Sequence, residues 1–476
     1  MSDQFSLRLR APAFHFKALS LAVILSIAGC GGGDDDAPAL AQILGCNGTV
    51  TYDEVEGTLP GGTPWGMRRP TNWNGVLIND LDYIPRKDSA QNCYWLQRGY
   101  GLSGTNRHPQ RNNIYDPERE TTELLSVMDS FTQRYGKPTR TIQYGHSGGG
   151  YVALNFAERY PNRVDGVVAG CAHEPVVLMN MMHDGWYVLR TLLAPQLQIL
   201  NFDALTTVSS QAQQWRTALT QAQATPAGKA RIALASAIGQ WAPWTDTTKP
   251  KPNFNDPVAF QQAIFETAIV NSSQPGGQSR YMFEHAGGSA TARNLSWNSG
   301  IDYGQLFNRA EPATKALVES LYAASGTTLQ ADLATLGSTQ RVQADPGAID
   351  FWNQPGRIVR GRPQVPVLRT HTTGDHAVPP TIIDSYTQKM QANQGNTALY
   401  RTAIVDRTGH CTFDASEAAA SVEVLLERIS TGTWPDTTPA AMNARAKSLF
   451  PSSTPLFVAY QPVSANRPQN NPSGGL

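Results

Sequence analysis

The feature that most constrains this 476-residue chain is the stretch TIQYGHSGGGYVALNFAERYP, residues 141–161. Its pattern is that of a strand, then a turn with four glycines around one serine and one histidine, then an amphipathic helix. A strand that turns at once into a helix brings its own backbone close together at the corner. Side chains two residues before and after the corner residue Ser147 would collide there, so Gly145 and Gly149 supply the space that the turn needs.

Strand and helix patterns alternate on both sides of this corner. The buried-strand patterns are NGVLIND, RTIQY, VDGVVAGC, VPVLRTH and LYRTAIV, and helical patterns with one apolar face accompany them. The last helical pattern begins with Asp414 and Glu417 in a capping-box arrangement. Short connections between alternating strands and helices predict an α/β fold, with a mostly parallel sheet covered by helices on both faces.

The alternation stops within residues 175–360. This segment is rich in Gln, Ala, Thr and Asn, carries helical patterns and holds six of the ten tryptophans. We therefore expect a mainly helical cap inserted into one α/β core, which consists of residues 46–174 and 361–435. Residues 436–476 are rich in Pro, Asn and Ser, and their composition predicts a tail that packs only through the segment PLFVAY.

The N-terminus has the pattern of an export signal. Basic residues precede the apolar run ALSLAVILSIAGC, which is shorter than the roughly 20 apolar residues that span a bilayer. The run ends in Ile-Ala-Gly-Cys30, which resembles a bacterial lipobox, so we expect residues 1–29 to be a signal peptide and Cys30 to carry lipid. Residues 30–45 then form a tether. The alternative is an ordinary signal peptide cleaved nearby. The first interpretation predicts a lipoprotein of the outer membrane or cell surface, and the second a periplasmic or secreted protein.

The corner sequence Gly-His-Ser-Gly-Gly fits the G-x-S-x-G nucleophile elbow, with the expected strand before it and helix after it. A glycine-rich turn could instead hold a phosphate, but no Lys-Ser or Lys-Thr follows and the spacing is not G-x-G-x-x-G. On these residues the chain resembles the serine α/β-hydrolase superfamily. The resemblance implies an α/β-hydrolase fold in which Ser147 is the nucleophile.

The resemblance also implies an acid and a histidine after later strands, in the order Ser, acid, His. Asp375 in GDHAVP follows VPVLR, and His410 in Gly-His follows LYRTAIV, so these two residues match the acid and the base. The alternatives are a plain surface turn around Asp375, and the neighbouring His376 as the base. The other histidines near these motifs, expected to be pocket walls or supporting groups, are His146, His173 and His371.

The oxyanion of such a reaction needs two hydrogen-bond donors, and the resemblance implies backbone N–H groups. One is that of Gly148, directly after the nucleophile. The other should follow the strand GVLIND, where related secreted hydrolases have His-Gly-Tyr and this chain has Leu-Asp82-Tyr83. We expect the backbone N–H of Asp82 or Tyr83 to be the second donor, although an aspartate replaces the glycine.

Four cysteines remain after Cys30, an even number in an exported chain, so two disulfides are expected. Four cysteines allow three pairings. The resemblance favours Cys171–Cys411, because Cys411 follows the implied base and Cys171 ends the strand after the nucleophile helix, which leaves Cys46–Cys93. The alternative is that Cys171 is a buried free thiol.

Together these residues predict an exported serine hydrolase that cleaves carboxylic esters through an acyl-enzyme, with no cofactor and no metal ion. The substrate is a small-molecule or polymeric ester, and the tryptophans of the cap favour an apolar or aromatic group in it. The 38 basic and 38 acidic residues balance, which argues against a nucleic-acid partner. The membrane is contacted only through the lipid anchor.

Two other functions stay open. A serine aminopeptidase of the proline-iminopeptidase type shares this fold and needs an acidic anchor for the substrate amine, which Glu174 could supply. A hydrolase-fold lipoprotein could also bind ligands without catalysis, although the presence of all three residues of the implied triad argues against it.

Overall fold

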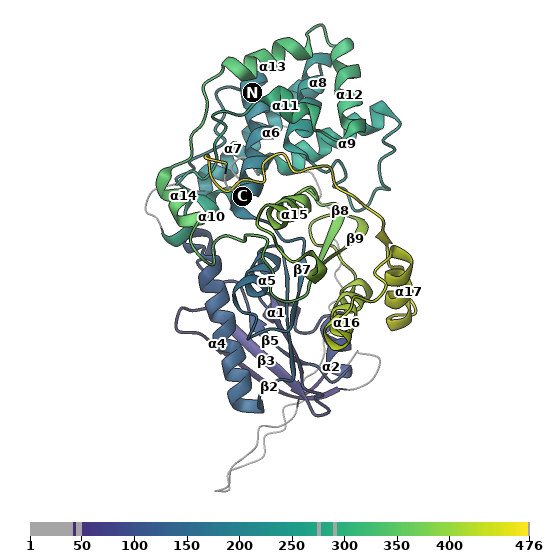
Figure 1. Cartoon of the computed structure of the whole chain (residues 1–476). Coiled ribbons are helices and arrows are strands. Elements are labelled where there is room, and N and C mark those ends of the chain that lie inside the picture. The colour runs from purple at the N-terminus through teal and green to yellow at the C-terminus, as the bar shows by residue number, and fades with distance from the viewer. Residues whose placement is uncertain (1–40, 44–49, 274–277, 289–292, 475–476) are drawn as a thin grey trace, which may run out of the picture. The chain divides into compact units, whose positions relative to one another are not determined.

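A mixed sheet carries the candidate site in the computed structural model, which describes residues 41–43, 50–273, 278–288 and 293–474 (Figure 1). The strands of the described residues are, in chain order, β1 (Ala41–Ile43), β2 (Val50–Thr58), β3 (Pro64–Pro70), β4 (Val76–Asp80), β5 (Gly101–Thr105), β6 (Arg140–His146), β7 (Gly166–Gly170), β8 (Val367–Gly374), β9 (Tyr400–Thr408) and β10 (Phe457–Val458). Their order in the sheet is β1-β2-β3-β5-β4-β6-β7-β8-β9-β10.

The six central strands, from β5 to β9 in the sheet order, run parallel to one another. The strands at the two edges, β1 to β3 and β10, pair antiparallel. Parallel strands place their carboxyl ends at one edge of the sheet, so the loops after β6, β7, β8 and β9 gather there. The predicted α/β fold with a mostly parallel sheet is confirmed.

Helices cover both faces of this sheet. On one face α4 (Pro117–Tyr135), α5 (Gly148–Arg159) and α15 (Ile382–Ala392) pack with β7 through Val167. On the other face α2 (Ala90–Gln97) and α16 (Ala415–Thr431) pack through the next residue, Val168. The capping box of α16 is present, since Asp414 accepts from the Glu417 N–H and Glu417 accepts from the Asp414 N–H.

Between β7 and β8 lies a helical segment, residues 175–360, which we call the insertion. Its helices are α6 (Pro175–Leu192), α7 (Leu205–Gln223), α8 (Pro226–Gly239), α9 (Pro257–Val270), η1 (Asn271–Ser273), α10 (Gln278–Glu284), η2 (Ala286–Gly288), α11 (Tyr303–Asn308), α12 (Pro312–Ala323), α13 (Leu329–Ser338) and α14 (Pro346–Trp352). Five of its six tryptophans are buried, and the rings of Trp186 and Trp215 lie 5.0 Å apart. These tryptophans form a hydrophobic core, so their number does not indicate an aromatic substrate.

The C-terminal segment packs more extensively than its composition predicts. It contains α17 (Pro439–Leu449), and in Figure 1 its trace runs back to the helices of the insertion. There the buried Arg467 donates to both carboxylate oxygens of Asp184 on α6, at 2.8 and 2.9 Å. A buried carboxylate needs such a partner, and the tail supplies it. The prediction that the tail packs only through PLFVAY is therefore wrong.

The predicted tether also differs in part, because residues 41–43 form β1 and pair with β2. The predicted signal peptide and Cys30 lie outside the described residues. Among the helices that are described, none has both the length and the apolar character needed to cross a membrane.

Candidate active site

Ser147 occupies a sharp corner between β6 and α5. Its backbone has φ 58° and ψ −118°, a conformation that residues with a side chain rarely adopt. A Cβ atom on Gly145 would lie 2.3 Å from the carbonyl oxygen of Gly149, so a residue other than glycine would collide there. A Cβ atom on Gly149 itself would meet Leu81 only at 3.4 Å, an ordinary contact. Of the two glycines, Gly145 is therefore the one at which a side chain would not fit.

Asp375 and His410 lie together at the same edge of the sheet, after β8 and β9. Asp375 is fully buried, and its Oδ2 accepts a hydrogen bond from His410 Nδ1 at 2.8 Å. Its Oδ1 accepts from the N–H groups of Ala377 and Val378 at 3.0 and 2.9 Å. Burial would raise the pKa of Asp375, but His410 and these donors outweigh burial and lower it. Burial would lower the pKa of His410, but the Asp375 carboxylate outweighs burial and raises it.

The histidines next to Asp375 do not replace His410 in this contact. His371 is fully buried beneath the acid, with Nε2 2.9 Å from the Val378 carbonyl oxygen and 3.6 Å from Asp375 Oδ2. Burial lowers the pKa of His371 to about 4, so it is neutral. His376 has its backbone carbonyl bound by Asn271 of the insertion, at 3.2 Å. The hydrogen bond from an imidazole to Asp375 comes from His410.

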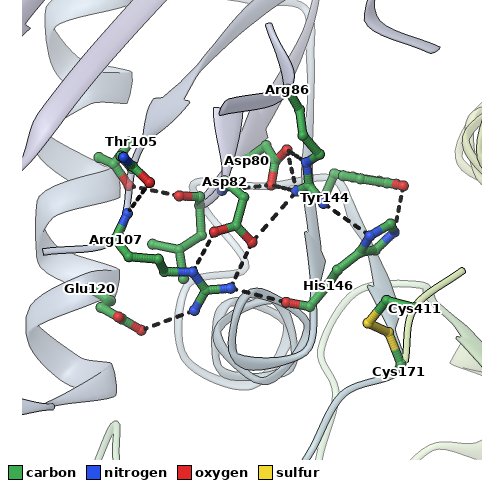
Figure 2. Close-up of polar contacts among 12 residues, drawn as sticks. Asp80, Asp82, Arg86, Thr105, Arg107, Glu120, Tyr144, His146, Cys171 and Cys411 are labelled. Atoms are coloured by element: carbon green, nitrogen blue, oxygen red, sulfur yellow. Dashed lines mark hydrogen bonds and ion pairs between the residues drawn. A yellow bond between two sulfur atoms is a disulfide. The ribbon is translucent and has the colours of Figure 1, made fainter. Parts of the chain in front are cut away.

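Two further histidines line the corner. His146 precedes the serine, and Figure 2 shows its ring between Arg86 and Tyr144. Its Nδ1 accepts from Arg86 Nη1 at 2.9 Å, and its Nε2 lies 2.7 Å from Tyr144 Oη, so both ring nitrogens are occupied. His173 is buried and stacks on Tyr151, with ring centroids 5.6 Å apart. Burial lowers the pKa of both imidazoles well below the usual range.

Figure 2 shows a disulfide between Cys171 and Cys411, whose Cα atoms are 5.6 Å apart. Cys171 directly follows Gly170, whose carbonyl oxygen accepts the Ser147 N–H at 2.9 Å. Cys411 directly follows His410. The bond therefore holds the loop that carries His410 near the corner that carries Ser147. Cys93 is also disulfide-bonded, and its predicted partner Cys46 lies outside the described residues.

Loss of this disulfide should lower activity before it unfolds the protein. We expect the double variant Cys171→Ser, Cys411→Ser to lose at least about tenfold in kcat while its circular dichroism at 25 °C stays that of the wild type, because misplacing a catalytic group by about 1 Å can cost 10²-fold. The two residues are 240 positions apart, so the variant should also unfold at lower denaturant concentration. Cys93→Ser is the matched control. Wild-type kcat in the double variant would contradict the positional role of the bond.

The Gly148 N–H lies where an oxyanion donor is expected, because Gly148 is the first residue of α5 and the first N–H groups of a helix have no acceptor within it. Of the two predicted candidates for the second donor, Asp82 and Tyr83, the Asp82 N–H already donates to Asp80 Oδ1 at 3.1 Å, so a substrate would have to replace that bond. Tyr83, the first residue of α1 (Tyr83–Arg86), remains the backbone candidate for the second donor.

A network of charges that the sequence patterns did not reveal surrounds the corner (Figure 2). Asp82 holds Arg107 through two hydrogen bonds, one of them 2.7 Å long from Nη2 to Oδ2, and Arg86 holds Asp80. Burial would raise the pKa of Asp82, but Arg107 outweighs it and lowers the pKa to about 2. Arg111 donates to Glu120 at 2.7 Å.

Glu174, the predicted anchor for a substrate amine, is not available for that role. It is buried, forms an ion pair with Lys389 and accepts from Ser385 Oγ at 2.5 Å.

Among the described residues, one group of three neighbouring side chains is of types that can bind a metal ion, namely Cys171, His410 and Cys411. Its two sulfur atoms are bonded to each other, so the group lacks the thiolates that bind metal ions.

The mostly parallel sheet, the strained serine between β6 and α5 and the similarity to the proteins named next define the class: the chain belongs to the serine α/β-hydrolase superfamily. Residues 89–293 match the family model "Serine aminopeptidase, S33". The chain is 41% identical over 432 residues to o-phthalyl amidase of Xanthobacter agilis, which covers 86% of this chain and 94% of that protein.

Two of the solved structures that this chain is similar to are esterases. Feruloyl esterase B from Aspergillus oryzae is 14% identical, with 82% of each chain covered and a TM-score of 0.39. An esterase from Pyrococcus furiosus is 10% identical, with 80% of this chain and 91% of that chain covered and a TM-score of 0.35.

Proposed function

We propose that this hydrolase cleaves carboxylic amides and esters, with Ser147 as nucleophile, His410 as general base and Asp375 as the group that orients the base. The observation that carries the proposal is the 2.8 Å hydrogen bond from His410 Nδ1 to the buried Asp375, on the loop that the disulfide joins to the Ser147 corner. A nucleophile with a base, and a base with an orienting acid, are the parts of a serine triad.

The reaction follows from the tautomer of His410. The hydrogen on Nδ1 points to Asp375, so the lone pair of Nε2 is free to take the proton of Ser147 Oγ. As Oγ bonds to the carbonyl carbon, the Gly148 N–H stabilises the oxyanion and Asp375 stabilises the imidazolium. Imidazolium then gives its proton to the leaving amine or alcohol, and the acyl group stays on Ser147. Water, deprotonated by His410, releases the acid.

The relative that covers nearly the whole chain supports an amide substrate. It is named o-phthalyl amidase and shares 41% of residues over 432 positions. We therefore extend the predicted ester specificity to amides, and propose an aromatic acyl group of the o-phthalyl kind.

The test uses two substrates that share one acyl group and differ in the leaving group. They are the monoanilide and the monophenyl ester of phthalic acid. We expect the purified protein to hydrolyse both. With hydroxylamine added, the ratio of hydroxamate to acid should be the same from either substrate, because both pass through the same acyl-enzyme. Different ratios would exclude a common acyl-enzyme, and no turnover of either substrate would exclude the proposed reaction.

The aminopeptidase function has one observation in its favour, the description of the matched family model. Against it, Glu174 is paired with Lys389. A non-catalytic binding role predicts no turnover in the test above. We also propose that the protein is exported and that Cys30 carries lipid. Radiolabelled palmitate should then label the wild type and not Cys30→Ala. Equal labelling of both proteins would refute this proposal.

A further inference from the structure

We infer that Arg107 and Arg111 form a carboxylate-binding pair beside the nucleophile, and that they select an acyl group with a free carboxylate next to the scissile carbonyl. The inference rests on the proposed function for the reaction, but concerns residues that neither the predicted triad nor the predicted oxyanion donors include.

Both guanidinium groups lie against Gly148, the residue that follows Ser147. A Cβ atom on Gly148 would be 2.6 Å from Arg107 Nη1 and 2.7 Å from Arg111 Nη2. The absence of a side chain at this position is therefore what lets two cations approach the corner. Gly148 directly follows Ser147, and consecutive Cα atoms are about 3.8 Å apart, so the two guanidinium groups lie close to the nucleophile.

The acids of the network hold the arginines from behind. Asp82 accepts from Nε and Nη2 of Arg107, and Glu120 accepts from Nε of Arg111. Of the nitrogens that these acids do not bind, Arg107 Nη1 and Arg111 Nη2 lie over Gly148. The two side chains are 21% and 19% exposed as a whole, whereas the Arg107 Nη1 atom is itself buried.

Arg107 Nη1 lacks a hydrogen-bond partner among the described residues. It forms an ion pair with Glu120 Oε2 at 3.9 Å, which is too far for a hydrogen bond. A buried cationic donor without an acceptor is costly, and a ligand carboxylate would supply the acceptor. Guanidinium groups bind carboxylates with two parallel N–H···O bonds, and the N-terminus of α5 favours negative charge at the same place.

The position of the pair decides which substrate group it can bind. An acyl group bonded to Ser147 has its carbonyl oxygen at the Gly148 N–H. A carboxylate on the carbon next to the one that bears this carbonyl therefore comes close to the guanidinium groups over Gly148. The ortho position of an aromatic acid fits this arrangement, whereas a para carboxylate lies on the opposite side of the ring.

Three anilides that differ only in the acyl group test the inference: 2-carboxybenzoyl, 4-carboxybenzoyl and benzoyl. For the wild type we expect kcat/KM to be highest for the 2-carboxybenzoyl substrate. In Arg111→Met, its ratio to the benzoyl substrate should fall about 10- to 100-fold, the effect of losing a hydrogen bond to a charged group. Arg111→Lys should keep part of the ratio, because lysine retains the charge but not the fork. Arg163→Met, which removes a surface arginine that pairs with Asp129, is the matched control and should leave the ratio unchanged.

Other outcomes overturn the inference. An equal loss for all three anilides in Arg111→Met would show a role toward the oxyanion instead, and an unchanged ratio would show a purely structural role.

Calorimetry separates this inference from the proposed function, because it needs no turnover. Phthalate should bind the wild-type protein more tightly than benzoate or terephthalate, and Arg111→Met should abolish the difference. If the protein hydrolyses none of the anilides but binds phthalate in this way, the proposed reaction is wrong and the anion site stands. If phthalate and benzoate bind equally, the anion site is wrong whatever the protein hydrolyses.

Discussion

Ser147→Ala is expected to lower kcat for both the anilide and the phenyl ester by about 10⁴- to 10⁶-fold, the range seen when one member of a serine triad is removed. The reason is that the reaction needs a hydroxyl oxygen at this corner as the nucleophile, and alanine has none. Alanine has the same backbone demands as serine, so the strained conformation at φ 58° and the melting temperature should change little. Single-turnover assays together with a thermal melt check both points.

Ser130→Ala, at a half-buried position on α4, is the control and should keep wild-type kcat. A folded Ser147→Ala protein that retained activity within tenfold of the wild type would remove Ser147 from the proposed mechanism.

His410→Ala should be as damaging as the serine variant, about 10⁴- to 10⁶-fold in kcat. The neighbouring His376→Ala should stay within about tenfold of the wild type, because the imidazole hydrogen-bonded to Asp375 is that of His410. The reverse result would mean that His376 acts as the base and that the loop after β8 moves on substrate binding.

The pH profile gives an independent check of the same residue. The base must be neutral to accept a proton, and Asp375 raises the pKa of His410 above its ordinary 6.5. The rate kcat/KM of the wild type should therefore rise with pH through a value above 6.5 and level off beyond it.

The candidate triad could be predicted because each residue is part of a short motif at the end of a parallel strand. The glycine requirement of the corner, the Asp375 loop and the Gly-His410 pair are all visible within a few residues of sequence. The parallel sheet then places these motifs at one edge, whatever lies between them in the chain.

The arginine pair could not be predicted in this way. Arg107 follows β5, whose sequence GLSGT has two glycines and no apolar alternation, so the strand itself carried little signal. When that strand is not recognised in the sequence, nothing predicts that Arg107 and Arg111 lie at the edge of the sheet that carries the candidate site.

The hydrogen bond of the Asp82 N–H had a local signal in the sequence. An aspartate often accepts the N–H of the residue two positions later, and Asp80 does so here. This turn occupies the N–H that the resemblance implied as a donor.

The ion pair between Asp184 and Arg467 bears on how the chain folds during synthesis. The two residues are separated by 283 positions, and both are buried. The ribosome completes α6 long before it reaches the arginine, so the carboxylate of a nascent insertion has no partner during most of translation. A buried charge without its partner destabilises a fold by about 3–5 kcal/mol. The native insertion is therefore completed only after Arg467 has been made, and an mRNA with a stop codon before codon 467 would yield a chain without this ion pair.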